Sequence, residues 1–186
     1  MRAPVLTAFL VAATMALAPA ATPVRAQSPA VSAQTVKAAF LCKFPGYVDW
    51  PAGADPADRP LTIGVLGSPA MADELVRLTS DRKVGERPVE VRAVKGGDSL
   101  AGLQVLYVGN GTAEELPQSL APARSLPILV VTDAPGALAS GSVINFTVER
   151  DRVRFEVSLP AAERSGLKLS SRLLAVAQRV EREPGP

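Results

Sequence analysis

Hydrophobic residues recur every four positions near the start of the chain. Val36, Phe40, Phe44 and Val48 follow this step, and alanines lie between the first two of them. Such a step places apolar side chains on one side of a helix, so the pattern predicts an amphipathic helix from Gln34. The proline that follows Phe44 removes a backbone donor and clashes with the preceding turn. We therefore predict that the helix ends or kinks near Phe44.

Short apolar runs alternate with helical segments through the middle of the chain. A helix is predicted after the first run, with Ser68 as its N-cap and Pro69 in its first turn. A second helix is predicted from about Ala113 to Leu120. This alternation favours right-handed crossovers and a mainly parallel sheet with helices on its faces. The predicted strands are Leu61–Leu66, Val89–Val94, Val105–Val108 and Ile128–Val131.

Apolar and polar residues alternate strictly in the last third of the chain. If Arg150 and Asp151 turn the chain, apolar residues pair on one face and polar residues on the other, which predicts a half-solvated antiparallel hairpin. An apolar stripe from Ser170 to about Glu181 predicts a closing helix. The expected fold class is thus α/β, a single domain with a mainly parallel sheet flanked by helices, a C-terminal antiparallel hairpin and a closing helix. The predicted cross-strand pairs are Ile144–Val157, Asn145–Glu156, Phe146–Phe155, Thr147–Arg154, Val148–Val153 and Glu149–Arg152.

The first 26 residues are typical of an export signal. Arg2 supplies a positive charge, the apolar run after it is too short to span a bilayer, and Val24 and Ala26 occupy the third and first positions before Gln27. We expect cleavage after Ala26 and a soluble periplasmic product, with residues 27–186 as one domain. An uncleaved anchor is the weaker alternative, because two prolines interrupt the stretch.

The composition excludes several kinds of catalytic and metal site. The chain contains no histidine and one cysteine, which excludes the Ser/His/Asp triad, the Cys/His dyad and Cys/His zinc sites. Loss of Arg2 and Arg25 with the signal reduces the 20 basic residues to 18, equal to the 18 acidic ones. This balance disfavours nucleic acid as a partner. Cys42 has no partner in the chain and is interpreted as a buried, inert thiol; an intermolecular disulfide or a reactive thiol is the alternative.

Six segments of the chain, taken together, point to a known family: Val36–Leu41, Trp50–Pro51, Leu61–Gly67, Ile144–Phe146, Val153–Val157 and Gly166–Leu174. In their order and spacing they resemble the YfiR-like family of exported bacterial proteins. The resemblance runs from about Thr35 to Ala177. It implies a non-enzymatic periplasmic inhibitor that binds the sensor region of an inner-membrane diguanylate cyclase and restrains cyclic di-GMP synthesis. It also implies an outer-membrane partner that can sequester the inhibitor. We expect no cofactor and no metal, and a second copy of the chain is a further candidate partner.

Candidate partner-binding residues fall in two places. Trp50 is the only tryptophan; such a residue most often plugs a core edge, and a partner anchor is the alternative interpretation. Glu156, Arg164, Lys168 and Arg172 lie around the outer hairpin face and the start of the closing helix. A solvated charged face explains these four equally well. Because the resemblance is dense here, we expect inhibition to map to this C-terminal polar surface.

A candidate ligand-binding crevice lies where predicted strands end. Gly67 and Ser68 stand between a strand and a helix, where backbone donors and the helix dipole could hold an anion, and Thr132 and Asp133 could reach the same crevice. The alternative function is thus a periplasmic module for a small anion or a nucleotide. Ordinary helix capping and a turn explain the same residues, since the glycine spacing matches no dinucleotide or P-loop motif. A hydrolase is disfavoured, because no Gly-x-Ser-x-Gly elbow occurs.

Overall fold

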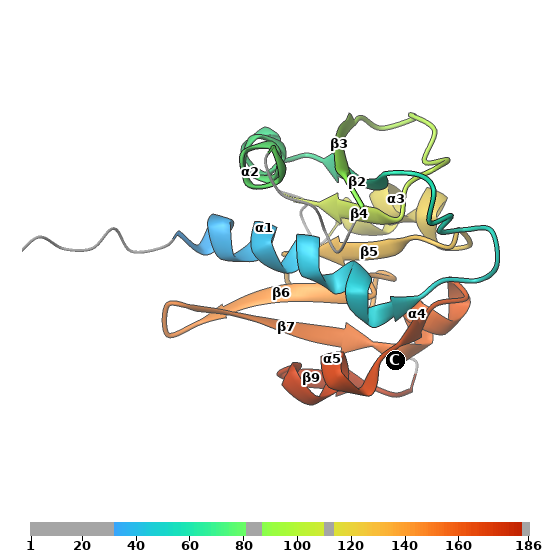
Figure 1. The fold of residues 1–186 in the computed structure, drawn as a ribbon. Coiled ribbons are helices and arrows are strands. Elements are labelled where there is room, and N and C mark those ends of the chain that lie inside the picture. The colour runs from blue at the N-terminus through green and yellow to red at the C-terminus, as the bar shows by residue number, and fades with distance from the viewer. Residues whose placement is uncertain (1–31, 81–86, 110–113, 184–186) are drawn as a thin grey trace, which may run out of the picture. The chain divides into compact units, whose positions relative to one another are not determined.

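One mixed sheet organises the part of the chain that the structure describes. The computed structural model describes residues 32–80, 87–109 and 114–183, and the predicted signal, residues 1–26, lies outside these ranges. The sheet formed by the described residues has seven strands in the order β3-β2-β4-β5-β6-β7-β9 (Figure 1). These strands are β2 (Leu61–Leu66), β3 (Val89–Val94), β4 (Val105–Val108), β5 (Leu129–Thr132), β6 (Ile144–Glu149), β7 (Arg152–Ser158) and β9 (Arg179–Glu181).

The strand directions confirm the predicted α/β class. β2 pairs in parallel with both β3 and β4, β4 pairs in parallel with β5, and β5 pairs in parallel with β6. β6 and β7 form the antiparallel hairpin, and β9 returns parallel to β7. The chain therefore runs outward from β2 to β3 and then crosses to the other side of β2 at β4. This reversal creates a switch point between β2 and β4.

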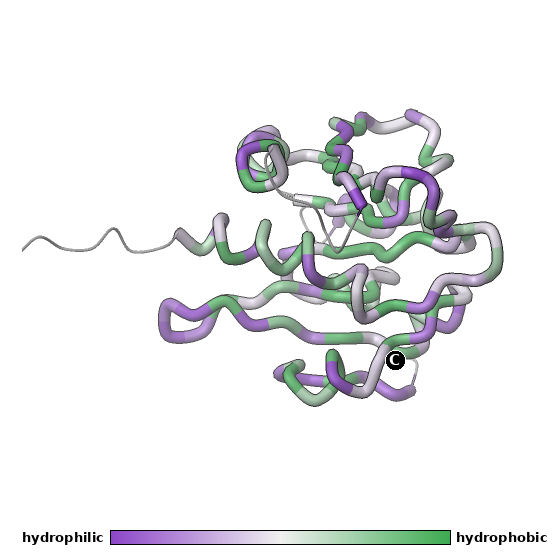
Figure 2. Tube along the Cα trace, viewed as in Figure 1, coloured by the Kyte–Doolittle hydropathy of each residue, from purple (hydrophilic) through white to green (hydrophobic). Residues whose placement is uncertain are grey.

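Helices cover both faces of the sheet and enclose two hydrophobic cores. The helical segments are α1 (Ala33–Lys43), η1 (Phe44–Tyr47), α2 (Pro69–Thr79), α3 (Leu116–Leu120), η2 (Ala121–Ala123), α4 (Leu159–Arg164) and α5 (Ser171–Val176). The first core contains side chains of α1, η1, α2, α4 and α5, and the second contains those of α3 and η2. Alternate residues of β4 and β5 belong to different cores, so both strands are buried on both faces, and β5 is hydrophobic along its length in Figure 2.

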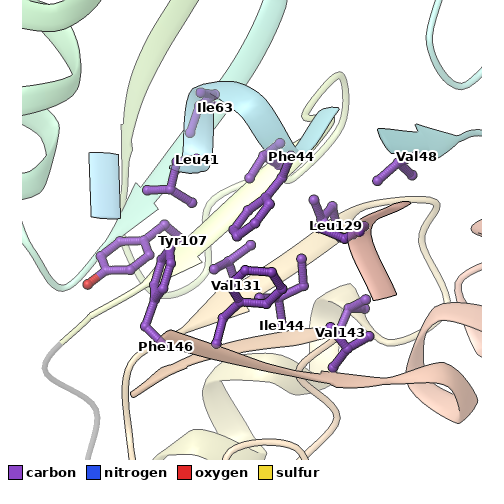
Figure 3. Close-up of a cluster of buried hydrophobic side chains, with 14 of the residues drawn as sticks. Leu41, Phe44, Val48, Ile63, Tyr107, Leu129, Val131, Val143, Ile144 and Phe146 are labelled. Carbon is purple, nitrogen blue, oxygen red and sulfur yellow. The ribbon is translucent and has the colours of Figure 1, made fainter. Parts of the chain in front are cut away.

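Phe44 lies in an aromatic cluster that joins the two ends of the fold. Its ring centroid is 5.7 Å from that of Phe146 and 5.2 Å from that of Phe155, and Figure 3 shows Phe44 and Phe146 in the first core. Phe40 of α1 stacks on Phe44 at 5.6 Å. Aromatic pairs at these separations add to the stabilisation from burial alone. The N-terminal helix is thus held to the C-terminal hairpin.

The predicted bounds of the first helix and the predicted start of the second are confirmed, with one difference. α1 begins after Ser32, whose Oγ accepts from the backbone N–H of Thr35, and gives way to the 3-10 turn at Phe44, one residue before the proline. α2 begins at Pro69, and Ser68 occupies the N-cap position as predicted. The Ser68 side chain makes no capping hydrogen bond, so the expected capping interaction is wrong.

The hairpin has the predicted register at all six pairs. Arg150 and Asp151 make the turn with φ of 49° and 60°, as a two-residue turn of type I′ requires. The core covers only the base of the apolar face: Phe146 and Phe155 are each 3% exposed, whereas Val148 is 55% exposed. The turn extends beyond the neighbouring strands and is hydrophilic (Figures 1 and 2).

The closing helix is shorter than predicted. α5 ends at Val176, and Arg179–Glu181 forms β9 instead of continuing the helix to Glu181. The backbone N–H of Gln178 donates to the carbonyl of Phe155 at 2.9 Å, and Val180 pairs with Val157. β7 would otherwise present an unpaired edge, and satisfying its backbone groups outweighs helical periodicity in this segment.

The structure differs from the sequence prediction in three smaller respects. α3 begins at Leu116 rather than near Ala113, which lies outside the described residues, because Pro117 favours the first turn of a helix. The fourth predicted strand is shifted by one residue. Neither α4 nor the antiparallel pair of β1 (Val48–Asp49) with β8 (Lys168–Leu169) was predicted, since two-residue strands carry no periodic signal.

Candidate functional site

The carboxyl ends of β2, β4 and β5 meet at one edge of the sheet. Gly67 and Ser68 follow β2, Gly109 follows β4, and Asp133 follows β5. Because these parallel strands are neighbours, the structure brings Ser68 and Asp133 to the same edge, on either side of the end of β4. Ligands of open α/β sheets bind at this edge, beside the switch point. The sequence prediction placed these residues at the correct edge.

Gly67 and Gly109 approach each other closely at the switch point. The backbone N–H of Gly109 donates to the carbonyl of Leu66 at 2.9 Å. A Cβ at Gly67, whose φ is 75°, would collide with the carbonyl oxygen of Gly109, and a Cβ at Gly109 would lie 2.8 Å from that of Ser68. Both positions therefore exclude any side chain, which makes the edge compact between β2 and β4.

Asp133 joins this edge to α1. Its Oδ2 accepts a hydrogen bond of 2.6 Å from the Tyr107 hydroxyl and one of 2.9 Å from Lys37 Nζ. The Lys37 and Asp133 side chains are 16% and 20% exposed. Burial, and then the hydrogen bond to the carboxylate, raises the pKa of Tyr107 far above its usual range, so the phenol stays protonated and donates. Asp133 is therefore engaged within the protein.

Thr132 is fully buried. Its hydroxyl lies 2.9 Å from Ser142 Oγ and 2.8 Å from Asn145 Oδ1, and Asn145 Oδ1 also accepts from the backbone N–H of Ala134. This network satisfies polar groups between β5 and β6, as buried hydroxyls require. Unlike Gly67, Ser68 and Asp133, Thr132 is enclosed at the end of its strand.

A cavity of about 580 Å³ lies on the α3 side of the switch point. It has an apolar floor and a polar rim, a combination common in small-molecule sites. Sequence reasoning missed this cavity, and it missed Lys37, Tyr107 and Gly109 as parts of the edge. A tyrosine among aliphatic strand residues and a lysine on the inner side of a helix were the available signals. The floor and rim include Leu66, Val94, Leu106, Val108, Lys95 and Gln118.

A second surface forms around the β1–β8 pair. The register places Asp49 opposite Lys168, so the Trp50-Pro51 segment lies beside the connection from α4 to β8. A Cβ at Gly166 would be 3.6 Å from Pro51 Cγ, and the backbone N–H of Ser170 donates to the carbonyl of Tyr47 at 2.9 Å. We define the β1–β8 surface by Trp50, Arg164, Lys168 and Arg172.

The residues of the β1–β8 surface differ in burial. Arg164, Lys168 and Arg172 are exposed, and none makes an ion pair with another described residue. Trp50 packs against the first core, and its Nε1 is buried without a hydrogen-bond partner among the described residues. Its contacts fit the expectation of a core-edge plug, and its position beside Lys168 keeps the partner-anchor interpretation open.

Glu156 lies apart from the β1–β8 surface. Phe155 and Val157 point into the first core, so the alternation of β7 directs Glu156 to the opposite face of the sheet. There it lines a cavity of about 430 Å³ with Asn145 and Arg179, and its Oε1 is 4.0 Å from Arg179 Nη1. The charged residues that are close in sequence are therefore divided between two faces.

Cys42 is half-buried and packs against the first core. Burial raises the pKa of its thiol to about 11, well above that of an exposed cysteine. The protonated form therefore predominates at neutral pH, which supports the interpretation of an inert thiol.

The architecture and its edge define the class of this protein. A mainly parallel sheet with helices on both faces and a switch point is a doubly wound α/β domain. The chain belongs to the YfiR/HmsC-like family, whose sequence model matches residues 34–178. In the described part of the chain, no helix has the length and apolar character needed to cross a bilayer.

A solved structure shares the fold. The chain is similar to the crystal structure of a conserved domain protein from Vibrio cholerae O1 biovar El Tor str. N16961, with a TM-score of 0.54 and 12% sequence identity. The match covers 81% of this chain and 60% of that one, so this chain spans less than two thirds of the length of its structural relative. At this identity the similarity supports the fold alone.

Proposed function

We propose that the chain is exported, is cleaved after Ala26, and restrains an inner-membrane diguanylate cyclase by binding the periplasmic sensor region of that enzyme through the β1–β8 surface. The protein acts by association and not by catalysis. An outer-membrane partner that sequesters it would release the cyclase and allow cyclic di-GMP to accumulate. The observation that carries this proposal is the β1–β8 pair, which sets Trp50 beside Lys168, a cation that makes no ion pair with another described residue.

The chemistry of the β1–β8 surface suits a protein partner. Trp50 supplies apolar area at an edge of the core, while Arg164, Lys168 and Arg172 remain exposed and free of internal ion pairs among the described residues. Aromatic and arginine side chains dominate binding energy in protein interfaces, and flanking charges set partner choice and the rate of encounter. The complementary sensor surface should therefore be acidic around an apolar pocket.

Charge reversal tests this surface without disturbing the core. In the double variant Arg164→Glu/Lys168→Glu, both altered side chains are exposed, so the melting temperature should stay nearly unchanged. Pull-down of the sensor domain should weaken, and cyclic di-GMP should rise in cells that carry the cognate cyclase. The matched control is Arg154→Glu, an exposed charge reversal on the hairpin. If the folded double variant still represses like wild type, the proposed surface is wrong.

The alternative, a small-anion or nucleotide module at the carboxyl edge, has less geometric support. Lys37, the cation at this edge, is already paired with Asp133, and an anion placed there would face the carboxylate. Calorimetric titration with inorganic phosphate and with nucleotides distinguishes the two functions. Heat of binding that disappears in Lys37→Met, with sensor binding unaffected by the charge reversals, would favour the alternative.

A further inference from the structure

The polar face of β6, β7 and β9 carries a row of side chains across neighbouring strands. Asn145 of β6 pairs with Glu156 of β7, and Glu156 pairs with Arg179 of β9. Residues that pair across strands lie side by side on one face of a sheet. All three line the cavity of about 430 Å³, together with Glu181, which follows Arg179 by two residues and so shares its face. The sheet therefore forms one wall of this cavity.

Asn145 offers this cavity a hydrogen-bond donor. The residue is 3% exposed, and its Oδ1 accepts from Thr132 Oγ1 at 2.8 Å and from the backbone N–H of Ala134 at 3.2 Å. A backbone N–H only donates, so the atom that it meets is the amide oxygen, and the orientation of the amide is fixed. Nδ2 makes no hydrogen bond with another described residue and is the group left to face the cavity. An unpartnered donor in a buried side chain costs stability, which a ligand that accepts from it would restore.

The two charged side chains of the row leave space between them. Glu156 Oε1 and Arg179 Nη1 are 4.0 Å apart, which is too long for a direct hydrogen bond. The Glu156 side chain is 22% exposed and that of Arg179 is 62% exposed, so the guanidinium lies nearer to solvent. A ligand hydroxyl placed between them accepts from Arg179 and donates to Glu156, and thereby joins two groups that the protein alone brings only close.

The order of donors and acceptors selects the class of ligand. The Asn145 amide donates, and the Glu156 carboxylate beside it accepts. The Arg179 guanidinium then donates, and the Glu181 carboxylate accepts. A hydroxyl does both, so adjacent hydroxyls on one molecule satisfy this alternation. A phosphate or carboxylate would engage only the donors and would face two glutamates, whereas an ammonium would engage only the acceptors.

A second wall of the cavity is apolar. It belongs to the segment between β5 and β6, in which Pro135 and Ala139 are exposed and Leu138 is buried. The ring carbons of a saccharide carry C–H groups as well as hydroxyls, and these C–H groups can pack on such a wall without the loss of any hydrogen bond. Small-molecule sites commonly combine apolar area of this kind with a few convergent polar groups.

We infer that this cavity is a saccharide site, which binds a neutral sugar through adjacent hydroxyls held by Asn145, Glu156 and Arg179. The inference goes beyond the proposed function and does not depend on it. The cavity lies on the face of the sheet opposite to the first core, whereas Trp50 of the β1–β8 surface packs against that core. It also gives Glu156 a role that its separation from the β1–β8 surface leaves open.

NMR titration of isotopically labelled protein tests the site through the side-chain amide of Asn145. The probes are the neutral sugars D-glucose, D-galactose, D-mannose and N-acetyl-D-glucosamine. At least one of them should shift the Nδ2 signals in a saturable way, with a dissociation constant of about 10 mM or lower. Inorganic phosphate and the free amino acid glycine carry the competing charged groups and should leave these signals unchanged. If no sugar shifts them, or if phosphate or glycine does so instead, the inference is overturned.

Two variants assign the binding to the cavity. Arg179→Met removes a donor and Glu156→Gln removes the charge of an acceptor, so each should raise the dissociation constant of the bound sugar by at least about fivefold. The matched control is Arg154→Met, which alters an exposed arginine on the same face of β7 but outside the cavity and should bind like wild type.

A sugar that both variants bind as tightly as wild type overturns the inference. Melting curves identify any variant that fails to fold, and the titration of wild-type protein then decides. Pull-down of the sensor domain should persist in Arg179→Met, so a failure of the saccharide site and a failure of the β1–β8 surface are distinguishable.

Discussion

Lys37 of α1 donates to Asp133 at 2.9 Å, although 96 residues separate the two in sequence. The pair holds the N-terminal helix against the end of β5, and Tyr107 donates to the same carboxylate oxygen. Both charged side chains are largely shielded from solvent. Loss of either partner leaves the other poorly solvated, so this contact stabilises more than an ordinary surface pair.

Lys37→Met and Asp133→Asn should each lower the free energy of unfolding by about 1–3 kcal/mol, because each leaves a partly buried polar group without its partner. The double variant should lose less than the two single losses combined, since both remove one interaction. Urea denaturation of the four proteins measures this coupling. The control pair, Arg77 and Glu74, has an arginine that is 63% exposed, and its removal should cost much less than the loss of Lys37 or Asp133, because solvent screens an exposed pair. If the losses in the two single variants add up to the loss in the double variant, Lys37 and Asp133 do not stabilise each other and the prediction is wrong.

Phe146→Ala and Phe155→Ala should each lower the free energy of unfolding by about 3–5 kcal/mol, the range for large aromatic side chains removed from a core. Both rings also pack against Phe44 of η1. The cavity that either substitution leaves would therefore border η1 as well as the hairpin, and a shift of the opposite phenylalanine would not fill it. Thr147→Ala and Arg154→Ala, on the opposite face of the same pair, should cost little. Chemical denaturation compares the four variants, and equal losses on both faces would be inconsistent with the core position of the hairpin.

Arg150→Asn with Asp151→Gly should raise the free energy of unfolding by about 1 kcal/mol. Both native residues have positive φ, which costs energy for a residue with a Cβ, and Asn-Gly suits a type I′ turn. Thermal denaturation measures the gain. Arg152→Asn serves as the control: Arg152 directly follows the turn and is the first residue of β7, so this change should bring no gain. A turn variant that is less stable than wild type would contradict this prediction, because it would mean that Arg150 and Asp151 are not strained at positive φ.

The alkylation rate of Cys42 should remain low at pH 7 to 8 and rise as the pH approaches about 11, since the thiolate is the reactive form and burial raises the thiol pKa to about 11. The same cysteine in denatured protein should react at lower pH. The folded state keeps the thiol proton that the unfolded state loses from about pH 9. The free energy of unfolding should therefore fall as the pH rises from about 9 to 11. Rapid alkylation of folded protein at pH 7 would contradict this prediction.

The sequence predicts best where one local pattern determines the outcome. The hairpin register followed from alternation over two adjacent segments, and both its turn and its six pairs were correct. Leu61–Leu66, Val89–Val94 and Val105–Val108 were predicted to the residue. The first and third are short apolar runs, and Val89–Val94 alternates apolar with charged residues after a proline. β9 was predicted as helix, since its apolar residue also fits a helical stripe and only the neighbouring edge of β7 decides between the two.

The candidate site was less predictable, because its geometry depends on contacts between distant segments. Alternation already indicated that Glu156 points away from the core, but the separation of Glu156 from Lys168 depends on the β1–β8 pair, which is too short to leave a pattern. In the sequence, nothing distinguishes Lys37 from an ordinary lysine on a helix. Its role becomes clear only from its ion pair with Asp133, which follows β5. The edge between Ser68 and Asp133 was predictable, since parallel strands end together.

The aromatic cluster also constrains when this chain can fold. Phe40 and Phe44 lie in the first helix, but the rings they pack against belong to the hairpin near the other end of the chain. Because a chain is synthesised from its N-terminus, its first core cannot be completed until the hairpin has also been synthesised. Cores that require such distant contacts form slowly, because the loop must close before any contact compensates for its entropy. The first core therefore stays incomplete until the hairpin has been synthesised, a delay that would suit the export that we propose for this chain.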